Sequence, residues 1–160
     1  MSGNIVLNIP TIDGNSEITG YTKKIIVHSY SHGVSANLAA EPSNTNRTSA
    51  PPNVSEFNFS KESDSATNKL YQACVRATNL GSCTLTVFKA SGTTLLKAFE
   101  YVFENALISS ISTSGGGGDP SDSFSLNFTK LTSTYVVQTD AVAGGGNLPW
   151  SYDRKAKVAT

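Results

Sequence analysis

Residues 107–128, LISSISTSGGGGDPSDSFSLNF, decide the fold class of this chain. Apolar and polar residues alternate on both sides of four successive glycines, and Asp119-Pro120 follows the last glycine. Alternation with a period of two is typical of a half-buried β-strand, and a Gly-Asp-Pro segment between two such strands is typical of a turn. We therefore predict a β-hairpin with a long tip, in a domain built mainly of strands.

Short segments with similar patterns recur along the chain. The segments that we predict as strands are residues 4–9, 23–30, 54–60, 82–89, 95–103, 105–113, 124–129, 134–139 and 150–154. The side chains that their alternation places on the inward face include Phe57, Phe59, Cys83, Leu85, Val87, Phe124, Leu126 and Phe128. About eight to ten short strands of this kind fit a β-barrel or sandwich of two sheets.

One segment has the period of a helix instead. Its apolar residues recur at spacings of three and four, and they are Ala66, Leu70, Cys74 and Ala77. Ser63 or Asp64 is the predicted N-terminal cap, because such side chains accept hydrogen bonds from the unpaired N–H groups of a first turn. Asn79 and Gly81 are expected to end the helix in left-handed conformations. The predicted fold class is mainly β, with one α-helix packed on the side of the sheets.

The segment 35–53 has a different composition. It contains three prolines together with several Asn and Ser residues, and it shows no periodicity. Loops of this length in compact domains are commonly functional or disordered. A chain of 160 residues fits one domain. We therefore treat residues 1–160 as a single domain with an extended loop at 35–53.

The charge composition argues against two kinds of partner. Twelve Lys and Arg residues balance twelve Asp and Glu residues, and charged residues make up only 15% of the chain. A protein that binds nucleic acid needs a basic excess or a basic patch, so we expect no nucleic-acid partner. Because no run of roughly 18 apolar residues occurs, we expect no membrane insertion.

The N-terminal sequence MSGNIVLNIPTIDG lacks the basic start and the apolar segment of a secretory signal. We therefore expect the chain to fold in the cytoplasm, where Cys74 and Cys83 stay reduced, most simply as buried thiols.

The sequence offers no recognisable catalytic or metal-binding constellation. His28 and His32 lie four residues apart on a predicted strand, a separation of about 13 Å that one ion does not bridge. Ser31 precedes His32, but neighbouring strand residues point to opposite faces. No G-x-S-x-G elbow occurs, and the glycines at 115–118 lack the Lys-Ser/Thr of a phosphate-binding loop. We expect no enzymatic activity, no cofactor and no metal.

Several segments carry a family resemblance through their order and spacing. They are Asp13-Gly14-Asn15-Ser16, IIVHSYSHGVS at 25–35, EFNFSKESDSATNKLYQAC at 56–74, TLTVFKASG at 84–92, LISSISTSGGGG…SFSLNFTKL from residue 107, and WSYDRKAKV at 150–158. Together they resemble the haemolysin-coregulated protein (Hcp) family, the tube subunits of bacterial type VI secretion systems. The Ser-Ser-x-Ser-Thr run with its glycine-rich continuation is the most specific piece. Asn15 stands where the family commonly has Glu, and His32 where an aromatic residue is common.

The resemblance implies a function in assembly. Members of the family form hexameric rings that stack into a hollow tube, which sheath contraction expels and which carries and chaperones effectors in its lumen. The implied partners are further copies of the chain, the spike and sheath proteins, and secreted effectors. The implied location is the bacterial cytoplasm, followed by secretion through the type VI apparatus without a signal peptide.

The resemblance also indicates positions to test. It places the strand with Ser29 and Ser31 near the lumen, where small hydroxyl side chains suit transient contact with cargo. For ring stacking we expect four residues of the long loop, chosen for side-chain reach: Asn37, Leu38, Glu41 and Arg47.

A lectin-like or other β-sandwich binding module is the alternative function. Such a module needs an aromatic platform, for which only Trp150 and Tyr152 are candidates.

Overall fold

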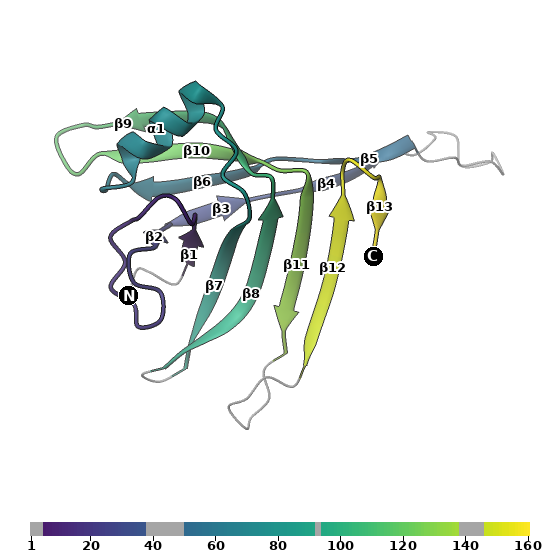
Figure 1. Cartoon of the computed structure of the whole chain (residues 1–160). Coiled ribbons are helices and arrows are strands. Elements are labelled where there is room, and N and C mark those ends of the chain that lie inside the picture. The colour runs from purple at the N-terminus through teal and green to yellow at the C-terminus, as the bar shows by residue number, and fades with distance from the viewer. Residues whose placement is uncertain (1–4, 38–49, 92–93, 138–145) are drawn as a thin grey trace.

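In the part of the chain that the structure describes, the fold consists of three antiparallel β-sheets and one α-helix (Figure 1). The computed structural model describes residues 5–37, 50–91, 94–137 and 146–160. Within these residues the strands are β1 (Ile5–Asn8), β2 (Ile25–Ile26), β3 (Ser29–Ser31), β4 (Val34–Asn37), β5 (Ala50–Val54), β6 (Phe57–Glu62), β7 (Cys83–Ser91), β8 (Thr94–Glu104), β9 (Leu107–Ser114), β10 (Ser121–Asn127), β11 (Lys130–Val136), β12 (Asn147–Asp153) and β13 (Val158–Ala159), and the helix is α1 (Thr67–Arg76).

Two of the sheets form a sandwich. The large sheet has the strand order β13-β12-β11-β8-β7-β1-β2, and the four-stranded sheet has the order β3-β6-β10-β9. The strands of the four-stranded sheet run across those of the large sheet, and α1 lies beside β9 (Figure 1). This arrangement confirms the predicted fold class, mainly β with a helix on the side. The predicted hairpin is also confirmed, because β9 and β10 pair on either side of the glycine tip.

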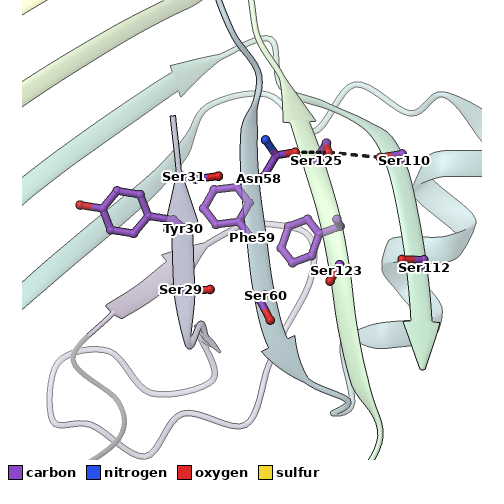
Figure 2. A pocket seen from close by; sticks show the side chains of 11 residues that line it. Ser29, Tyr30, Ser31, Asn58, Phe59, Ser60, Ser110, Ser112, Ser123 and Ser125 are labelled. Carbon is purple, nitrogen blue, oxygen red and sulfur yellow. Dashed lines mark hydrogen bonds between the residues drawn. The ribbon is translucent and has the colours of Figure 1, made fainter. Parts of the chain in front are cut away.

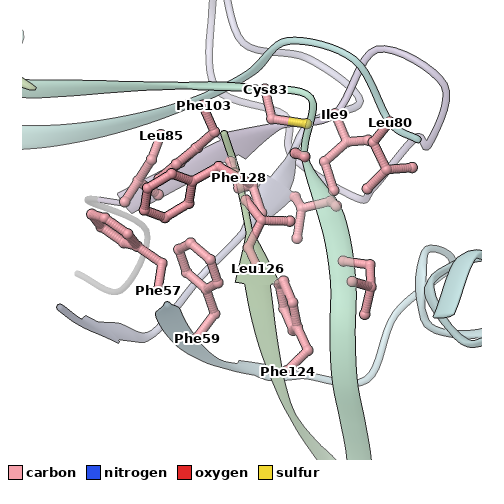
Figure 3. Packing of buried hydrophobic residues seen from close by; sticks show 14 of the residues in the cluster. Ile9, Phe57, Phe59, Leu80, Cys83, Leu85, Phe103, Phe124, Leu126 and Phe128 are labelled. Carbon is pink, nitrogen blue, oxygen red and sulfur yellow. The ribbon is translucent and has the colours of Figure 1, made fainter. Parts of the chain in front are cut away.

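Phenylalanine rings fill much of the space between the two sheets (Figure 3). The rings that are at most 2% exposed are those of Phe57, Phe59, Phe103, Phe124 and Phe128. The ring centroids of Phe57 and Phe103 lie 4.6 Å apart edge to face, and those of Phe59 and Phe124 lie 5.0 Å apart in a stack. Aromatic pairs of this kind stabilise by about 0.5–1.5 kcal/mol beyond the burial of their area. The inward positions predicted for β6 and β10 are confirmed.

The single strand predicted at 23–30 is two strands in two different sheets. β2 pairs with β1 in the large sheet, whereas β3 pairs with β6 in the four-stranded sheet. The change of sheet occurs at Val27 and His28, whose N–H groups bond the carbonyls of Ile5 and Ser60 respectively. A β-rich sequence here thus serves as the connection between the two layers.

The inward face of β7 follows its prediction for only part of its length. Cys83 and Leu85 are fully buried, but Val87 is half-buried beside a register shift between residues 87 and 88. Thr86 and Phe88 are buried on the opposite face, where the Tyr21 ring packs on Phe88 at 4.9 Å. The loop before β2 therefore covers a face that alternation alone assigns to solvent.

Helix α1 begins later than predicted. Its N-cap is Ala66, which forms no side-chain capping bond, rather than Ser63 or Asp64. The Asp64 carboxylate still accepts a hydrogen bond from the Ala66 N–H at 2.9 Å, so it satisfies a donor of the first turn from outside the helix. The buried residues on this side are Ala66, Leu70 and Ala73.

The helix also ends earlier than predicted. Ala77, not Asn79 or Gly81, is the left-handed C-cap, with φ of 49°. The N–H groups of Ala77 and Thr78 return to the carbonyls of Cys74 and Ala73, which closes the last turn. Consequently Cys74 is half-buried and Ala77 is exposed, although both belong to the predicted apolar stripe.

The predicted loop 35–53 begins and ends in strands. β4 and β5 pair as a two-stranded ribbon that extends away from α1 (Figure 1). Pro51 and Pro52 lie in β5, where a two-stranded ribbon tolerates them because one side of each strand has no ladder to maintain. The loop prediction is thus corrected for residues 35–37 and 50–53, and residues 38–49 lie outside the described part of the chain.

Candidate functional site

The outward face of the four-stranded sheet carries a concave pocket of about 310 Å³ lined mostly by serines (Figure 2). Its eleven lining residues include seven serines and one asparagine, and none carries a charge. The remaining three are Tyr30, Phe59 and Phe124. Such a surface offers many hydrogen-bond donors and acceptors without an electrostatic preference for either sign.

The polar side chains form two rows across the four strands. One row is Ser29, Ser60, Ser123 and Ser112, and the next is Ser31, Asn58, Ser125 and Ser110. We call these eight residues the hydroxyl grid. They share one face because successive strand residues alternate, so the inward positions between them hold the phenylalanines of the core. The strand sequences FNFSKE and SDSFSLN thus build the core and the grid together.

The second row is joined by side-chain hydrogen bonds (Figure 2). The Ser110 hydroxyl donates to the Ser125 hydroxyl at 3.2 Å, and the Ser125 hydroxyl donates to Asn58 Oδ1 at 2.6 Å. Within the part of the chain that the structure describes, the other hydroxyls of the grid form no side-chain hydrogen bond. Ser29, Ser31 and Ser123 are also exposed, so their hydroxyls are available to a bound molecule.

Among the described residues, charged side chains lie at the margins of the grid. Glu62 opposes Ser121 one row beyond it, and Glu62 Oε1 lies 3.3 Å from His28 Nε2. Beyond the other row, the Ser109 hydroxyl donates a hydrogen bond to the Glu56 carboxylate. The charges therefore frame the grid and do not enter it.

A buried ion pair fixes the grid from behind. Lys61 Nζ lies 2.9 Å from Asp122 Oδ2 and 2.9 Å from Asp64 Oδ1, and the Lys61 and Asp122 side chains are both fully buried. Three hydroxyls also donate to the Asp122 carboxylate, at 2.6–2.8 Å, and they belong to Ser63, Thr67 and Thr113. Together these groups tie β6, β10, β9 and the start of α1 to one another.

The ionisation of Asp122 reflects this network. Burial by itself would raise the pKa of its carboxyl group, but hydrogen bonds from Thr67, Ser63, Lys61 and Thr113 outweigh burial and lower the pKa to about 2. Asp122 therefore stays ionised, and the buried Lys61 ammonium keeps its partner. Sequence reasoning missed this pair, although Lys61 and Asp122 each occupy an inward position of an alternating strand, which is an unusual place for a charge.

The positions predicted from the sequence have separate outcomes. Ser29 and Ser31 lie together on β3, at one edge of the grid. Asn37 is the last residue of β4 in the ribbon and is not one of the residues that line the pocket. The other three predicted stacking residues, Leu38, Glu41 and Arg47, lie outside the described residues.

The two histidines have separate surroundings. The His32 ring stacks on Phe57 at 4.2 Å, and its buried Nε2 has no hydrogen-bond partner. Its pKa is lowered by burial. His28 instead lies beside Glu62 at the margin of the grid. In the described segments no group of three or more His, Cys, Asp or Glu side chains is arranged to hold a metal ion.

The remaining residues singled out from the sequence are the two cysteines and the aromatic pair of β12. Cys74 and Cys83 are free thiols, and burial raises the pKa of Cys83 to about 12. Trp150 is 41% exposed, but Tyr152 is only 7% exposed. These two residues therefore do not form the exposed platform that a lectin-like module needs.

The comparisons with known proteins agree with the architecture. Residues 6–135 match the family described as type VI secretion system effector, Hcp. This chain belongs to the Hcp family. This is a family of structural proteins of a secretion system and not a family of enzymes.

Relatives of known sequence and structure extend the match. The protein hcp1 of Pseudomonas aeruginosa is 28% identical over 109 residues, which cover 66% of this chain and 67% of that protein. The crystal structure of Hcp2 from Salmonella typhimurium is 26% identical, covers 95% of this chain and 96% of that one, and has a TM-score of 0.72. Hcp1 from Salmonella typhimurium has a TM-score of 0.81 at 23% identity, with full coverage of both chains.

The helical content adds one further finding. Among the described residues, no helix is long and apolar enough to cross a membrane.

Proposed function

We propose that this chain is a structural subunit of the type VI inner tube, in which six copies close into a ring and the rings stack into a hollow tube. Sheath contraction expels this tube, and the spike and sheath proteins are its partners. Membership of the Hcp family supports the proposal. The observation that carries it is the hydroxyl grid, a rigid, concave and uncharged face on one side of the subunit.

We assign the hydroxyl grid to the lumen of the ring, where it contacts effectors. A lumen that carries varied proteins needs to form hydrogen bonds with their surfaces without binding them tightly. Hydrogen bonds to a hydroxyl exchange with bonds to water, so each contributes only about 0.5–1.5 kcal/mol net. Ser29 and Ser31, predicted as cargo contacts, are two of the seven serines of the grid, and we assign the same role to the rest of the grid. We expect the chain to be made in the cytoplasm and to leave through the type VI apparatus.

The β4–β5 ribbon is the element that we assign to ring stacking. It projects from the sandwich (Figure 1), so it can reach an adjoining ring without disturbing the core. Asn37 at the end of β4, with Leu38, Glu41 and Arg47 in the segment that follows, are the proposed contacts.

Assembly is tested on the full chain. Native mass spectrometry and negative-stain imaging are expected to show a six-fold particle with a central hole. A monomer at every concentration tested would contradict the tube function.

Cargo contact is tested on the assembled ring with a co-expressed effector. Ser31→Lys and Ser123→Lys each place a long cation on the grid, and we expect at least a tenfold loss of co-purified effector with the ring intact. Thr19→Lys, on an exposed turn away from the grid, is the matched control. Equal effector recovery from all three variants would contradict the assignment of the grid to the lumen.

A further inference from the structure

Among the described residues, no layer covers one part of the inward face of the large sheet. Tyr135 on β11 and Trp150 on β12 are each 41% exposed, Leu148 on β12 is 63% exposed, and Phe99 on β8 is half-buried. We call these four residues the aromatic ledge. In Figure 1 the four-stranded sheet crosses β8, β11 and β12 near one end, and the other ends of these strands extend beyond it.

The strand register places the ledge on the same face as the core. Phe99 opposes Tyr135, Tyr135 opposes Leu148, and Trp150 opposes the buried Ser133. The rings also form a continuous series: Phe99 lies 5.0 Å from Tyr135 and 5.8 Å from Tyr101, and Tyr101 lies 5.2 Å from the central Phe57. The ledge is therefore a continuation of the core layer that the described residues leave uncovered.

Such a surface is unusual for a face that remains in water. Isolated exposed apolar residues are normal, but a contiguous apolar patch on a sheet face marks a contact site. Tyr and Trp are also enriched at the centres of protein interfaces, where they bury a large area at low conformational cost. The ledge thus has the composition of an interface centre.

The charge pattern of the ledge favours one kind of occupant. The inward-facing residues of β11, of β12 and of β8 from Phe99 onwards are Phe99, Tyr101, Phe103, Leu131, Ser133, Tyr135, Leu148, Trp150 and Tyr152, and none is Lys, Arg, Asp or Glu. An anionic lipid surface or a nucleic acid would find no cation among these nine residues, and a strongly charged protein would find no counter-charge among them. A second copy of this chain, with equal numbers of acidic and basic residues, meets no net repulsion.

The backbone groups of β12 limit the ways in which a neighbouring copy can bind at this side of the large sheet. The Ser151 N–H of β12 points outward, because it bonds the carbonyl of Thr160 on the outer side. The nitrogen of Pro149, two residues earlier, faces the same side and carries no hydrogen. An incoming strand would therefore lose a bond at this position. A neighbouring copy meets the face of the ledge more favourably than the edge of β12.

We propose that the aromatic ledge is the surface on which the next copy of this chain docks within the ring, an inference that rests on the proposed function. The contact joins the ledge to a different surface of the neighbour, as a cyclic assembly requires. A stable interface buries about 800 Å² on each partner, so the four ledge residues form its apolar centre and polar residues surround them.

Trp150 allows a test without any substitution, because it is the only tryptophan of the chain. The full-length ring is diluted until it dissociates, while the tryptophan emission and its quenching by acrylamide are recorded. We expect a red shift and at least a twofold rise in the quenching constant as rings become monomers. Dissociation with unchanged emission and quenching would overturn the proposal and leave the ring function intact. Failure to form any ring would contradict both the proposed interface and the proposed ring function.

A substitution supplies the second test. In Leu148→Asp the assembly concentration is expected to rise at least 100-fold, with the circular dichroism spectrum and melting transition of the folded monomer retained. Val75→Asp on α1 and Val158→Asp on β13 replace exposed valines outside the ledge, and both are expected to assemble like the unaltered chain.

Three results would overturn the proposal. Rings of Leu148→Asp at the usual concentration would do so, and so would equal disruption by both valine variants. The third is binding of the unaltered monomer to neutral phosphatidylcholine vesicles, lost in Leu148→Asp while its rings persist, because the ledge would then be a lipid-binding surface.

Discussion

The hydroxyl grid and the aromatic ledge are both uncharged, yet they belong to opposite kinds of surface. The grid is the outward face of the four-stranded sheet, and its apolar side is fully covered by the core. The ledge is the inward face of the large sheet at a place where the cover ends. Hydroxyl groups exchange one hydrogen-bond partner for another at little net gain, whereas apolar side chains gain about 25 cal/mol for each Å² removed from water. The first suits contacts that release, and the second suits contacts that persist.

The sharpest test of this contrast compares one substitution on the two surfaces. Leu126 is completely buried beneath the grid, whereas Leu148 is largely exposed on the ledge. Leu126→Asp buries a charge without a partner, so we expect the free energy of unfolding to fall by more than about 4 kcal/mol and the chain to unfold. Leu148→Asp is expected to remain folded. Urea unfolding followed by circular dichroism measures both, and a folded Leu126→Asp would refute the assignment of the two faces.

The next test removes the support behind the grid. Asp122→Asn leaves the buried Lys61 ammonium with Asp64 as its remaining carboxylate partner, and we expect a loss of about 3–5 kcal/mol in the free energy of unfolding. Adding Lys61→Met to this variant removes the unpaired charge, so the double variant is expected to be more stable than Asp122→Asn alone. If the double variant were less stable than both single variants, the ion pair would not be the source of the effect.

Acid acts on the same network in the unaltered chain. The pKa of Asp122 is about 2 when folded and 3.8 in the reference state, because four hydrogen bonds outweigh the effect of burial. A carboxyl group with a lowered folded pKa stabilises fully above the reference value. Its contribution, about 2 kcal/mol, is lost as the pH falls from about 4 towards 2. Urea midpoints across this range are expected to fall less steeply in Asp122→Asn than in the unaltered chain, and parallel curves would contradict the assignment.

Alternation in the sequence predicts the sandwich, the hairpin and the inward positions of β6 and β10, because a period of two follows directly from strand geometry. It also places Ser29 and Ser31 on one face. It does not predict that Ser60 and Ser123 lie beside them, because the lateral alignment of strands distant in the chain depends on tertiary pairing.

Features that the sequence reasoning missed have the same origin. Trp150 follows the same alternation as the buried Tyr152, and no local pattern says where the covering sheet ends. Ala77 adopts a left-handed conformation that its residue type disfavours, because the closing bonds of α1 and the packing of Leu80 fix the turn there. The sequence pattern did not predict β5, because this strand contains Pro51 and proline is uncommon in strands outside their edges.

The smallest expected effect concerns the residue that connects the two surfaces. His32 directly follows Ser31 of the grid, and its ring stacks on Phe57, whose own ring contacts Tyr101 in the series that leads to the ledge. Its Nε2 is buried without a partner, and burial lowers its pKa below the ordinary 6.5. Because the unfolded chain takes up this proton first, stability is highest above the unfolded pKa and declines as the pH falls below about 6.5.

The decline is less than about 1.4 kcal/mol for each pH unit, the limit for one proton. Tyr101 belongs to the same ring system, and burial raises the pKa of its hydroxyl group above the ordinary value. His32→Phe preserves a flat ring on Phe57 and removes the titration, so its urea midpoint is expected to depend less on pH between 7 and 5. His28→Phe, at the exposed margin beside Glu62, is the matched control. A flattened profile in the control and an unaltered one in His32→Phe would place the sensitivity at the margin of the grid and not between the two surfaces.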